Sequence, residues 1–140
     1  WSRGLYALQD FPITGLGMNN FREVVHIFYP LFLIPPDIDI AHAHNQFLQA
    51  GLDLGVPGMI AFIAIYILSF YLLAKRIKEA DSASKERFIA VGLMASLIAS
   101  VIFGMLDAIA LGGIPSFIFW LLIALVPHQG NELRENQIEV

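Results

Sequence analysis

Two long apolar runs constrain the fold of this chain more than any other feature. Residues 56–74 and 88–106 contain no charged residue. At a rise of 1.5 Å per residue, a helix of about 19 residues crosses a hydrocarbon core of roughly 30 Å. A third apolar run, residues 114–127, is shorter and begins beside glycine and proline residues. We expect all three runs to be transmembrane helices, so the predicted fold is an all-α integral membrane protein.

Composition agrees with a membrane protein. Of the 140 residues, 57% are hydrophobic and only 14% are charged, and the mean hydropathy is +0.68. Soluble domains average about 25% charged residues, so a disordered chain and a basic nucleic-acid binder are both excluded. The absence of cysteine excludes disulfide scaffolds and thiol chemistry. Because the chain begins at Trp1 and shows no signal-peptide pattern, we expect a fragment of a larger polytopic bundle.

Basic residues are concentrated between the first two apolar runs, and they predict an orientation. Five of the eight Lys and Arg residues lie there: Lys75, Arg76, Lys78, Lys85 and Arg87. By the positive-inside rule a short basic loop stays in the cytoplasm, so the segment before residue 56 is extracytoplasmic. The predicted order begins with an extracytoplasmic loop with short helices (residues 1–55), a transmembrane helix (56–74) and the cytoplasmic basic loop (75–87). A second transmembrane helix (88–106), an outer turn (107–113), a third transmembrane helix (114–127) and a cytoplasmic tail (128–140) follow.

The extracytoplasmic segment is mixed in character. Residues 21–33 have an amphipathic helical pattern, which we expect to end at Pro35 and Pro36. A polar cluster follows and leads into a short helix. Gly55 and Pro57 are the residues expected to end that helix.

The predicted short helix carries a polar stripe. Asn45, Gln49 and Asp53 are spaced four residues apart, which places them on one helix face. His44 falls in the predicted first turn, where free backbone N–H groups and the positive end of the helix dipole lie close to its imidazole. This arrangement favours an anion such as phosphate.

Four polar side chains gather at the start of this helix: His42, His44, Asn45 and Gln46. A histidine at a membrane surface is often only an interfacial polar residue, but the clustering favours a functional site. In an extended segment the two histidines would point the same way, as metal ligands do. Because a site needs a third ligand, and the remaining candidates have no recognised spacing, we expect no metal site. Those candidates are Asp37, Asp39 and His26.

Three charged residues elsewhere are further candidates for a functional role. Arg3 and Arg22 are the only Lys or Arg residues before residue 56, and a guanidinium can hold a phosphate with two hydrogen bonds. Each arginine could equally be a solvated charge that pairs with a nearby carboxylate such as Glu23 or Asp10. Asp107 lies at the outer end of the second apolar run, where an ionisable residue is either interfacial or functional.

The stretch from His42 to Gly58 resembles the signature of the O-antigen ligase and O-antigen polymerase (Wzy-type) superfamily. In that signature a histidine is followed by Asn, Ser or Gln, then by nine residues, a glycine, two further residues and a small residue. His44, Asn45, Gly55 and Gly58 fit every position. Two other stretches resemble the family pattern in the same order along the chain: Trp1, Ala7, Leu8, Pro12, Gly15, Gly17, Asn20 and Phe21, and then residues 103–107 with Phe119 and Trp120.

The resemblance implies a multi-pass enzyme of the bacterial inner membrane, with the motif loop on the periplasmic face. Such enzymes transfer a glycan from an undecaprenyl-diphosphate carrier in the lipid bilayer. The acceptor is the lipid A core for ligases and another carrier-linked repeat unit for polymerases. The resemblance implies a glycosyltransferase that needs no metal, no nucleotide sugar and no other cofactor.

The resemblance also implies roles for the clustered residues. His44 would be the catalytic residue, acting as the base that takes the proton of the attacking hydroxyl group. Arginines would hold the diphosphate, and neighbouring polar side chains would orient the sugar. The implied substrate-binding residues are Arg3, Arg22, His42, Asn45 and Gln46.

Two further interpretations stay open. The enzyme could act on another surface polymer, such as a capsule or an exopolysaccharide, or on a protein. A non-catalytic membrane module, such as a transporter segment or a packing subunit, would also suit the small residues of the second apolar run, but it has no use for the His44-Asn45 motif. Three helices cannot enclose a cleft for a lipid diphosphate, so we expect the 140-residue chain by itself to be inactive.

Overall fold

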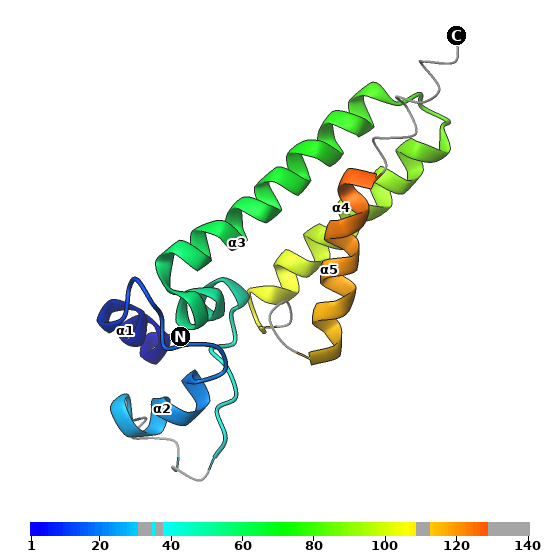
Figure 1. Cartoon of the computed structure of the whole chain (residues 1–140). Coiled ribbons are helices and arrows are strands. Elements are labelled where there is room, and N and C mark those ends of the chain that lie inside the picture. Colours follow the sequence, from blue (N-terminus) through cyan, green and yellow to red (C-terminus); the bar gives the residue numbers. More distant parts are fainter. Residues whose placement is uncertain (31–34, 36–37, 109–112, 129–140) are drawn as a thin grey trace.

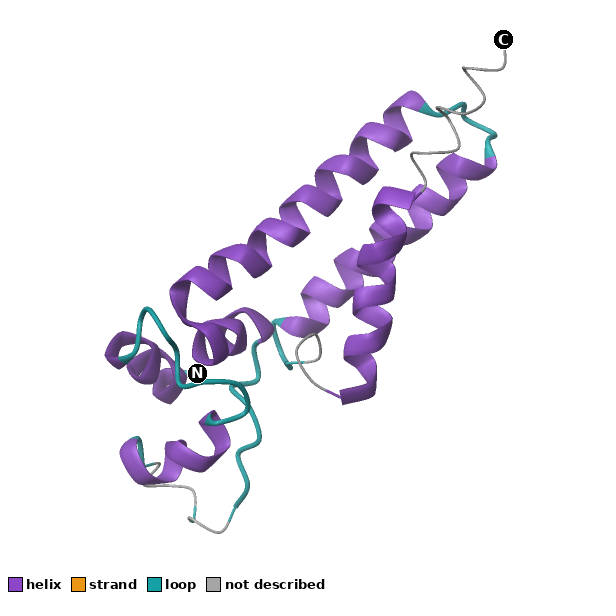
Figure 2. Cartoon of the chain, viewed as in Figure 1, coloured by secondary structure: helices purple, strands orange, loops and turns teal. Residues whose placement is uncertain are grey.

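The computed structural model describes residues 1–30, 35, 38–108 and 113–128. Within these residues all regular structure is helical, as predicted, and no strand is present (Figure 2). Five helices follow one another along the chain: α1 (Ser2–Asp10), α2 (Phe21–Phe28), α3 (Gln46–Glu79), α4 (Lys85–Gly104) and α5 (Gly113–His128). The long helices α3 and α4 lie side by side with α5 packed against them, whereas α1 and α2 gather where α3 begins (Figure 1).

Helix α2 ends earlier than the sequence pattern predicted. The pattern over residues 21–33 predicted a helix up to the proline pair, but α2 ends at Phe28. Pro30 explains the difference, because the residue before a proline is disfavoured in the helical region. That residue, Tyr29, has φ −130° and ψ 57°. The predicted break at Pro36 lies outside the described residues.

Helix α3 is broken at Gly55, as the sequence predicted. The backbone of Gly55 has φ 73° and ψ −179°, a conformation that is essentially confined to glycine. Pro57 falls in the first turn after the break, where a missing N–H removes no helical hydrogen bond. Helix α3 therefore consists of a short helix over residues 46–54 and a long helix over residues 56–79.

The loop over residues 11–17 closes this break on both sides. The carbonyl of Leu52, near the end of the short helix, accepts a hydrogen bond of 2.6 Å from the N–H of Leu16. The N–H of Val56, which opens the long helix, donates to the carbonyl of Pro12 at 2.7 Å. Helix ends leave such groups without a partner inside the helix. The loop thus supplies hydrogen bonds that the break removes.

Two glycines allow the loop to come this close. Gly15 has φ +65°, and a Cβ atom there would lie 2.5 Å from the Leu52 carbonyl oxygen and 2.7 Å from the Gly55 nitrogen. A Cβ atom at Gly55 would overlap the carbonyl group of Ile13. Any larger residue at either position would therefore push the two backbones apart.

The short helix turns back along the long helix. Gln46, at its start, donates to the hydroxyl of Tyr66 at 3.1 Å and to the carbonyl of Ser100 in α4 at 3.3 Å. The ring of Phe47 lies 5.8 Å from the ring of Phe62. Because Tyr66 lies about three turns beyond the break, these contacts require the short helix to run beside the long one. These contacts attach residues 42–45, which directly precede Gln46 and are called the histidine segment below, to the α3–α4 pair.

Buried apolar side chains form two clusters. The first lies among α3, α4 and α5 and includes Phe62, Tyr66, Leu73, Leu97 and Phe119. The second joins α1 and α2 to the short helix and includes Ala7, Phe21, Val25, Leu48 and Leu52. The second cluster therefore fixes the N-terminal helices against the short helix, independently of the first.

Two of the helices are long and apolar enough to cross a membrane, by length and composition: Gln46–Glu79 and Lys85–Gly104. Within the first, the long helix measures about 36 Å, which exceeds a hydrocarbon core of roughly 30 Å. The apolar part of α5, Ser116–Pro127, is shorter than a usual span. Large apolar side chains are exposed along all three helices, as a lipid-facing surface requires: Ile60, Ile67, Tyr71, Ile102, Phe117 and Leu121 are examples.

The connection between α3 and α4 is shorter than the predicted basic loop. Helix α3 continues past Ala74, and α4 begins at Lys85, so the turn covers only residues 80–84. Arg76 and Lys78 lie in the last turn of α3, where the helix dipole favours positive charge. The basic residues therefore sit on helix ends, and their cytoplasmic location stays a prediction.

Replacing Gly55 with alanine should lower the free energy of unfolding by about 3 kcal/mol, because the added Cβ meets the Ile13 carbonyl and the backbone conformation becomes strained. Gly92→Ala is the matched control, since a Cβ there meets nothing within 4 Å. In a helix that control change stabilises by roughly 0.5–1 kcal/mol. Thermal unfolding of the detergent-solubilised protein compares the two variants, and equal Tm values would contradict this account of the break.

Candidate active site

His44 does not lie in the first turn of the short helix, contrary to the prediction. Its backbone has φ 51°, in the left-handed region, and the helix begins two residues later. Asn45 is the N-cap, and its side-chain oxygen accepts hydrogen bonds from the N–H groups of Phe47 and Leu48 at 3.0 and 2.9 Å. These N–H groups are the ones that would bind an anion at the helix start. The predicted anion site is therefore already filled by the cap.

The cap explains the spacing of the histidine motif. Nine residues separate Asn45 from Gly55, and they form the short helix from its N-cap to the glycine that breaks it. At 3.6 residues per turn, this is about two and a half turns. Because each added residue rotates the helix start by about 100°, the length of the short helix decides where His44 points.

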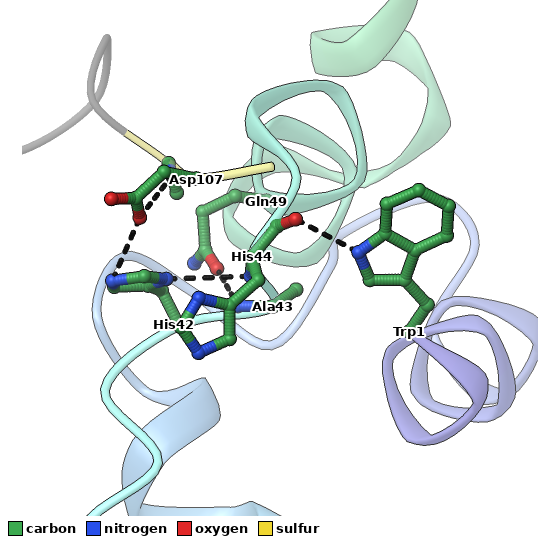
Figure 3. A network of polar contacts seen from close by, with 7 residues as sticks. Trp1, His42, Ala43, His44, Gln49 and Asp107 are labelled. Carbon is green, nitrogen blue, oxygen red and sulfur yellow. Dashed lines mark hydrogen bonds and ion pairs between the residues drawn. The ribbon is translucent and has the colours of Figure 1, made fainter. Parts of the chain in front are cut away.

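The polar stripe predicted on the short helix is formed, but it is buried. Asp53 accepts hydrogen bonds from the Gln49 side chain at 2.8 Å and from the N–H of Asn19 at 3.3 Å. The side-chain oxygen of Gln49 accepts in turn from the N–H of Ala43 at 3.0 Å (Figure 3). The stripe therefore holds the backbone between the two histidines and does not face a substrate.

Trp1, the residue before α1, holds the backbone of His44 from the other side. The indole Nε1 of Trp1 donates to the carbonyl of His44 at 2.8 Å (Figure 3). Helix α1, which follows Trp1, packs closely on the short helix, since a Cβ at Gly4 would lie 3.0 Å from the side chain of Leu48. The tryptophan and histidine stretches, which are distant in sequence, thus meet at the backbone of His44, while the residue as a whole stays exposed.

The structure adds a residue that the sequence did not connect with the histidines. Asp107 follows α4, and its Oδ1 lies 3.2 Å from Nε2 of His42. On the other side of the same ring, Nδ1 accepts a hydrogen bond from the N–H of His44 at 3.3 Å. The ring proton of neutral His42 is therefore on Nε2 and points to the carboxylate. No spacing rule links these residues, because a whole helical hairpin separates them in sequence.

Within the described part of the chain, one set of side chains is close enough together to share a metal ion. The set is His42, His44 and Asp107, whose ligand atoms lie within 4.8 Å of one another. The third ligands considered from the sequence do not join it. Asp39 pairs with Arg22, His26 bonds to a backbone carbonyl, and Asp37 lies outside the described residues.

A cavity of about 340 Å³ opens beside the histidines, within the usual size range for small-ligand sites. Its lining includes His42, His44, Arg3 and Asp39, together with apolar side chains of α2 such as Phe21. The cavity therefore combines a candidate base with a candidate cation. An exposed imidazole there can take a proton from a hydroxyl group, and a guanidinium can stabilise negative charge.

The structure shows what two of the predicted substrate-binding residues, Arg22 and Gln46, contact within the protein. Arg22 forms an ion pair with Asp39, and not with Glu23 or Asp10. The two side chains of this pair are 38% and 57% exposed, so a ligand can reach them. The side chain of Gln46 is fully buried, where it bonds to Tyr66 in α3 and to the Ser100 carbonyl in α4, and Gln46 is not among the residues that line the cavity.

A buried tyrosine joins the two short N-terminal helices. The hydroxyl of Tyr29, directly after α2, donates to Oδ2 of Asp10 in α1 at 2.7 Å. Burial, together with the adjacent carboxylate, raises the pKa of Tyr29 to about 12. The phenol therefore stays neutral at physiological pH, and its hydrogen bond holds α2, whose side chains line the cavity.

Comparison with known proteins adds one match. Residues 1–63 match the O-antigen ligase family, a family of membrane proteins that carry out glycosyl transfer. No curated protein and no solved structure matches the chain. The match confirms the resemblance predicted from the tryptophan and histidine stretches. The resemblance of residues 103–107 to the same family lies beyond the matched part and stays a prediction. The two motifs of the matched segment meet at Gly15 with Gly55 and at Trp1 with His44. Residues 1–63 are therefore similar to the O-antigen ligase family in sequence, and the structure brings the two matching stretches together.

Proposed function

We propose that this protein is a membrane glycosyltransferase that moves a glycan from an undecaprenyl-diphosphate carrier to the lipid A core or to another carrier-linked repeat unit. One observation carries the proposal: the exposed residue His44 and the cation of Arg3 line the same cavity. Glycosyl transfer from a diphosphate needs both a base for the attacking hydroxyl and a cation for the leaving group. The family match of residues 1–63 supports the same reaction class.

In the proposed mechanism His44 acts as the general base. The acceptor hydroxyl attacks the anomeric carbon of the donor and gives its proton to the imidazole. A glycosidic C–O bond forms while the C–O bond to the diphosphate breaks, and the diphosphate leaves with the electron pair. Trp1 and Asn45 fix the backbone on either side of His44, so the imidazole is held in place before the substrate arrives.

The arginines bind the diphosphate in this proposal. Arg3 lines the cavity directly. Arg22 is held at its edge by Asp39, and exposed ion pairs of this kind contribute only about 0–1 kcal/mol. A phosphate group can therefore replace the carboxylate, because guanidinium binds phosphate with two charge-assisted hydrogen bonds. In this proposal the base and the cations are all protein groups, and the donor is the carrier-linked glycan, so we propose a transfer step without a metal and without a nucleotide sugar.

The remaining motif residues divide between contact and positioning. His42 lines the cavity next to His44, and we assign it to contact with the sugar. Asn45 and Gln46, in contrast, are buried and bonded within the protein. We assign these two residues to positioning of the histidine segment.

We further propose that the long helix, α4 and α5 cross the bacterial inner membrane, with the histidine segment on the periplasmic face. Figure 1 supports this orientation, because the segment and the α3–α4 turn lie at opposite ends of the helix pair. The turn is flanked by basic residues, which favour the cytoplasmic side.

His44→Ala should lower glycan transfer by about 10²- to 10⁴-fold, which is the usual contribution of a general base. The measurement is the turnover of carrier-linked glycan in membrane vesicles that contain the protein at its natural length. The products separate two acceptors, since glycan on the lipid A core indicates a ligase and lengthened carrier-linked glycan indicates a polymerase.

The matched control for this change is His128→Ala. His128 ends α5, next to the last turns of α3 and away from the cavity, so both transfer and membrane insertion should be unaffected. Normal transfer by the His44 variant, with normal insertion, would sink the catalytic assignment and leave a non-catalytic membrane module as the better explanation.

Asn45 offers a test of positioning against sugar binding. Asn45→Ala should destabilise the protein by about 1 kcal/mol through loss of the N-cap, and transfer should fall because His44 is no longer held. Asn45→Ser should keep both stability and transfer, since serine is an equally good N-cap. If serine restores the Tm but not the transfer rate, the Asn45 amide contacts the sugar and our positioning role is wrong.

A further inference from the structure

Three potential metal ligands meet beside the cavity (Figure 3). His42 and His44 come from the segment before the short helix, and Asp107 comes from the chain just after α4. The ligand atoms of all three lie within 4.8 Å of one another. We propose that these side chains bind a divalent transition-metal ion such as Zn²⁺, and that an ion bound there blocks glycan transfer.

The distances are close to those of a metal site. For metal–ligand bonds of about 2.1 Å in a tetrahedral arrangement, neighbouring ligand atoms lie roughly 3.4 Å apart. Nε2 of His42 and Oδ1 of Asp107 are 3.2 Å apart, which is close to this spacing, so a small rotation of the two side chains lets both atoms bind one ion. His44 is exposed, and rotation of its side chain to another staggered position can bring its ligand atom to the same ion.

The donor chemistry favours zinc or a similar ion. Two imidazoles with one carboxylate are a ligand set in which Zn²⁺ keeps a fourth position open. His42 and His44 both line the cavity, so that fourth position is accessible to solvent or to a ligand oxygen. Mg²⁺ and Ca²⁺ prefer oxygen ligands, and we expect them to bind poorly here.

Metal binding changes one hydrogen bond in the segment. An ion on Nε2 of His42 moves the ring proton to Nδ1, which then no longer accepts from the N–H of His44. That hydrogen bond is long, at 3.3 Å. The segment keeps its stronger supports, because Gln49 still accepts from the N–H of Ala43 and Trp1 still donates to the carbonyl of His44.

An ion at this place would inhibit the enzyme. A histidine nitrogen that is bound to a metal has no lone pair for a proton, so coordinated His44 cannot act as the base. Inhibition therefore rests on the proposed function, whereas metal binding itself does not.

Titration of the metal-free, detergent-solubilised protein tests the binding. Co²⁺ serves as the probe through its visible absorption, Zn²⁺ competes with it, and we expect one ion per chain. His42→Ala and Asp107→Asn should each weaken Zn²⁺ binding by roughly 10–100-fold or more. Removing a residue that only hydrogen-bonds to a metal ligand already costs that much, and these two residues would bind the ion directly. His128→Ala and Asp81→Asn are matched controls, since both residues lie at the opposite end of the helices, and they should bind as the unchanged protein does.

Two further measurements keep folding and function apart. Zn²⁺ should raise the Tm of the unchanged protein and of both controls but not of the two ligand variants, whose metal-free Tm values show whether they fold. Asp107→Glu, which keeps a carboxylate, should restore part of the binding. Equal Zn²⁺ affinity in the ligand variants and the controls would overturn the metal site.

Transfer assays at saturating Zn²⁺ test the inhibition separately. We expect glycan transfer by the unchanged protein to be lost with zinc and restored by a chelator. If Zn²⁺ binds as expected but transfer continues, the metal site stands, and both the inhibition and the role of His44 as base are wrong. If transfer is absent even without metal, the proposed function fails while the binding result is unaffected.

Discussion

The structure depends on the close approach of two backbone segments at Gly15 and Gly55. Neither segment could come this near with a side chain present, because a Cβ at either glycine would strike the other backbone. The approach lets the loop over residues 11–17 bond the free groups at both sides of the helix break. Unpaired polar groups in a buried place are costly, so the break is stable only in the presence of this loop. The break in turn makes the short helix run back beside the long helix.

From this turn a line of polar contacts reaches the histidines. The side chain of Gln49 donates to Asp53 and accepts from the N–H of Ala43. From the opposite side, the indole of Trp1 donates to the carbonyl of His44. The backbone of the segment is thereby fixed while His44 itself is left exposed. The proposed base and the proposed metal ligand are the same imidazole, because a group presented in this way binds either a proton or an ion.

Much of the architecture could be predicted because it depends on local properties. Uninterrupted apolar length predicts the long helices, and the conformational freedom of Gly55 predicts the break. The spacing of the histidine motif is visible in the sequence, and the structure shows that this spacing is the length of the short helix. Two differences from the predicted elements are local as well. Pro30 ends α2 before the predicted break at Pro35 and Pro36, and the N-cap of the short helix is Asn45, so His44 lies before that helix.

The amino-acid pattern predicts the long helices, the break at Gly55 and the similarity of residues 1–63 to the O-antigen ligase family, since apolar patterns, glycine and motif spacing act over a few residues. Three features depend on how the helices pack together: the polar stripe is buried, Arg22 pairs with Asp39, and Asp107 lies beside His42. Each of these contacts joins segments from different elements. Their relative positions are set by the packing of whole helices, and no local pattern in the chain encodes that packing.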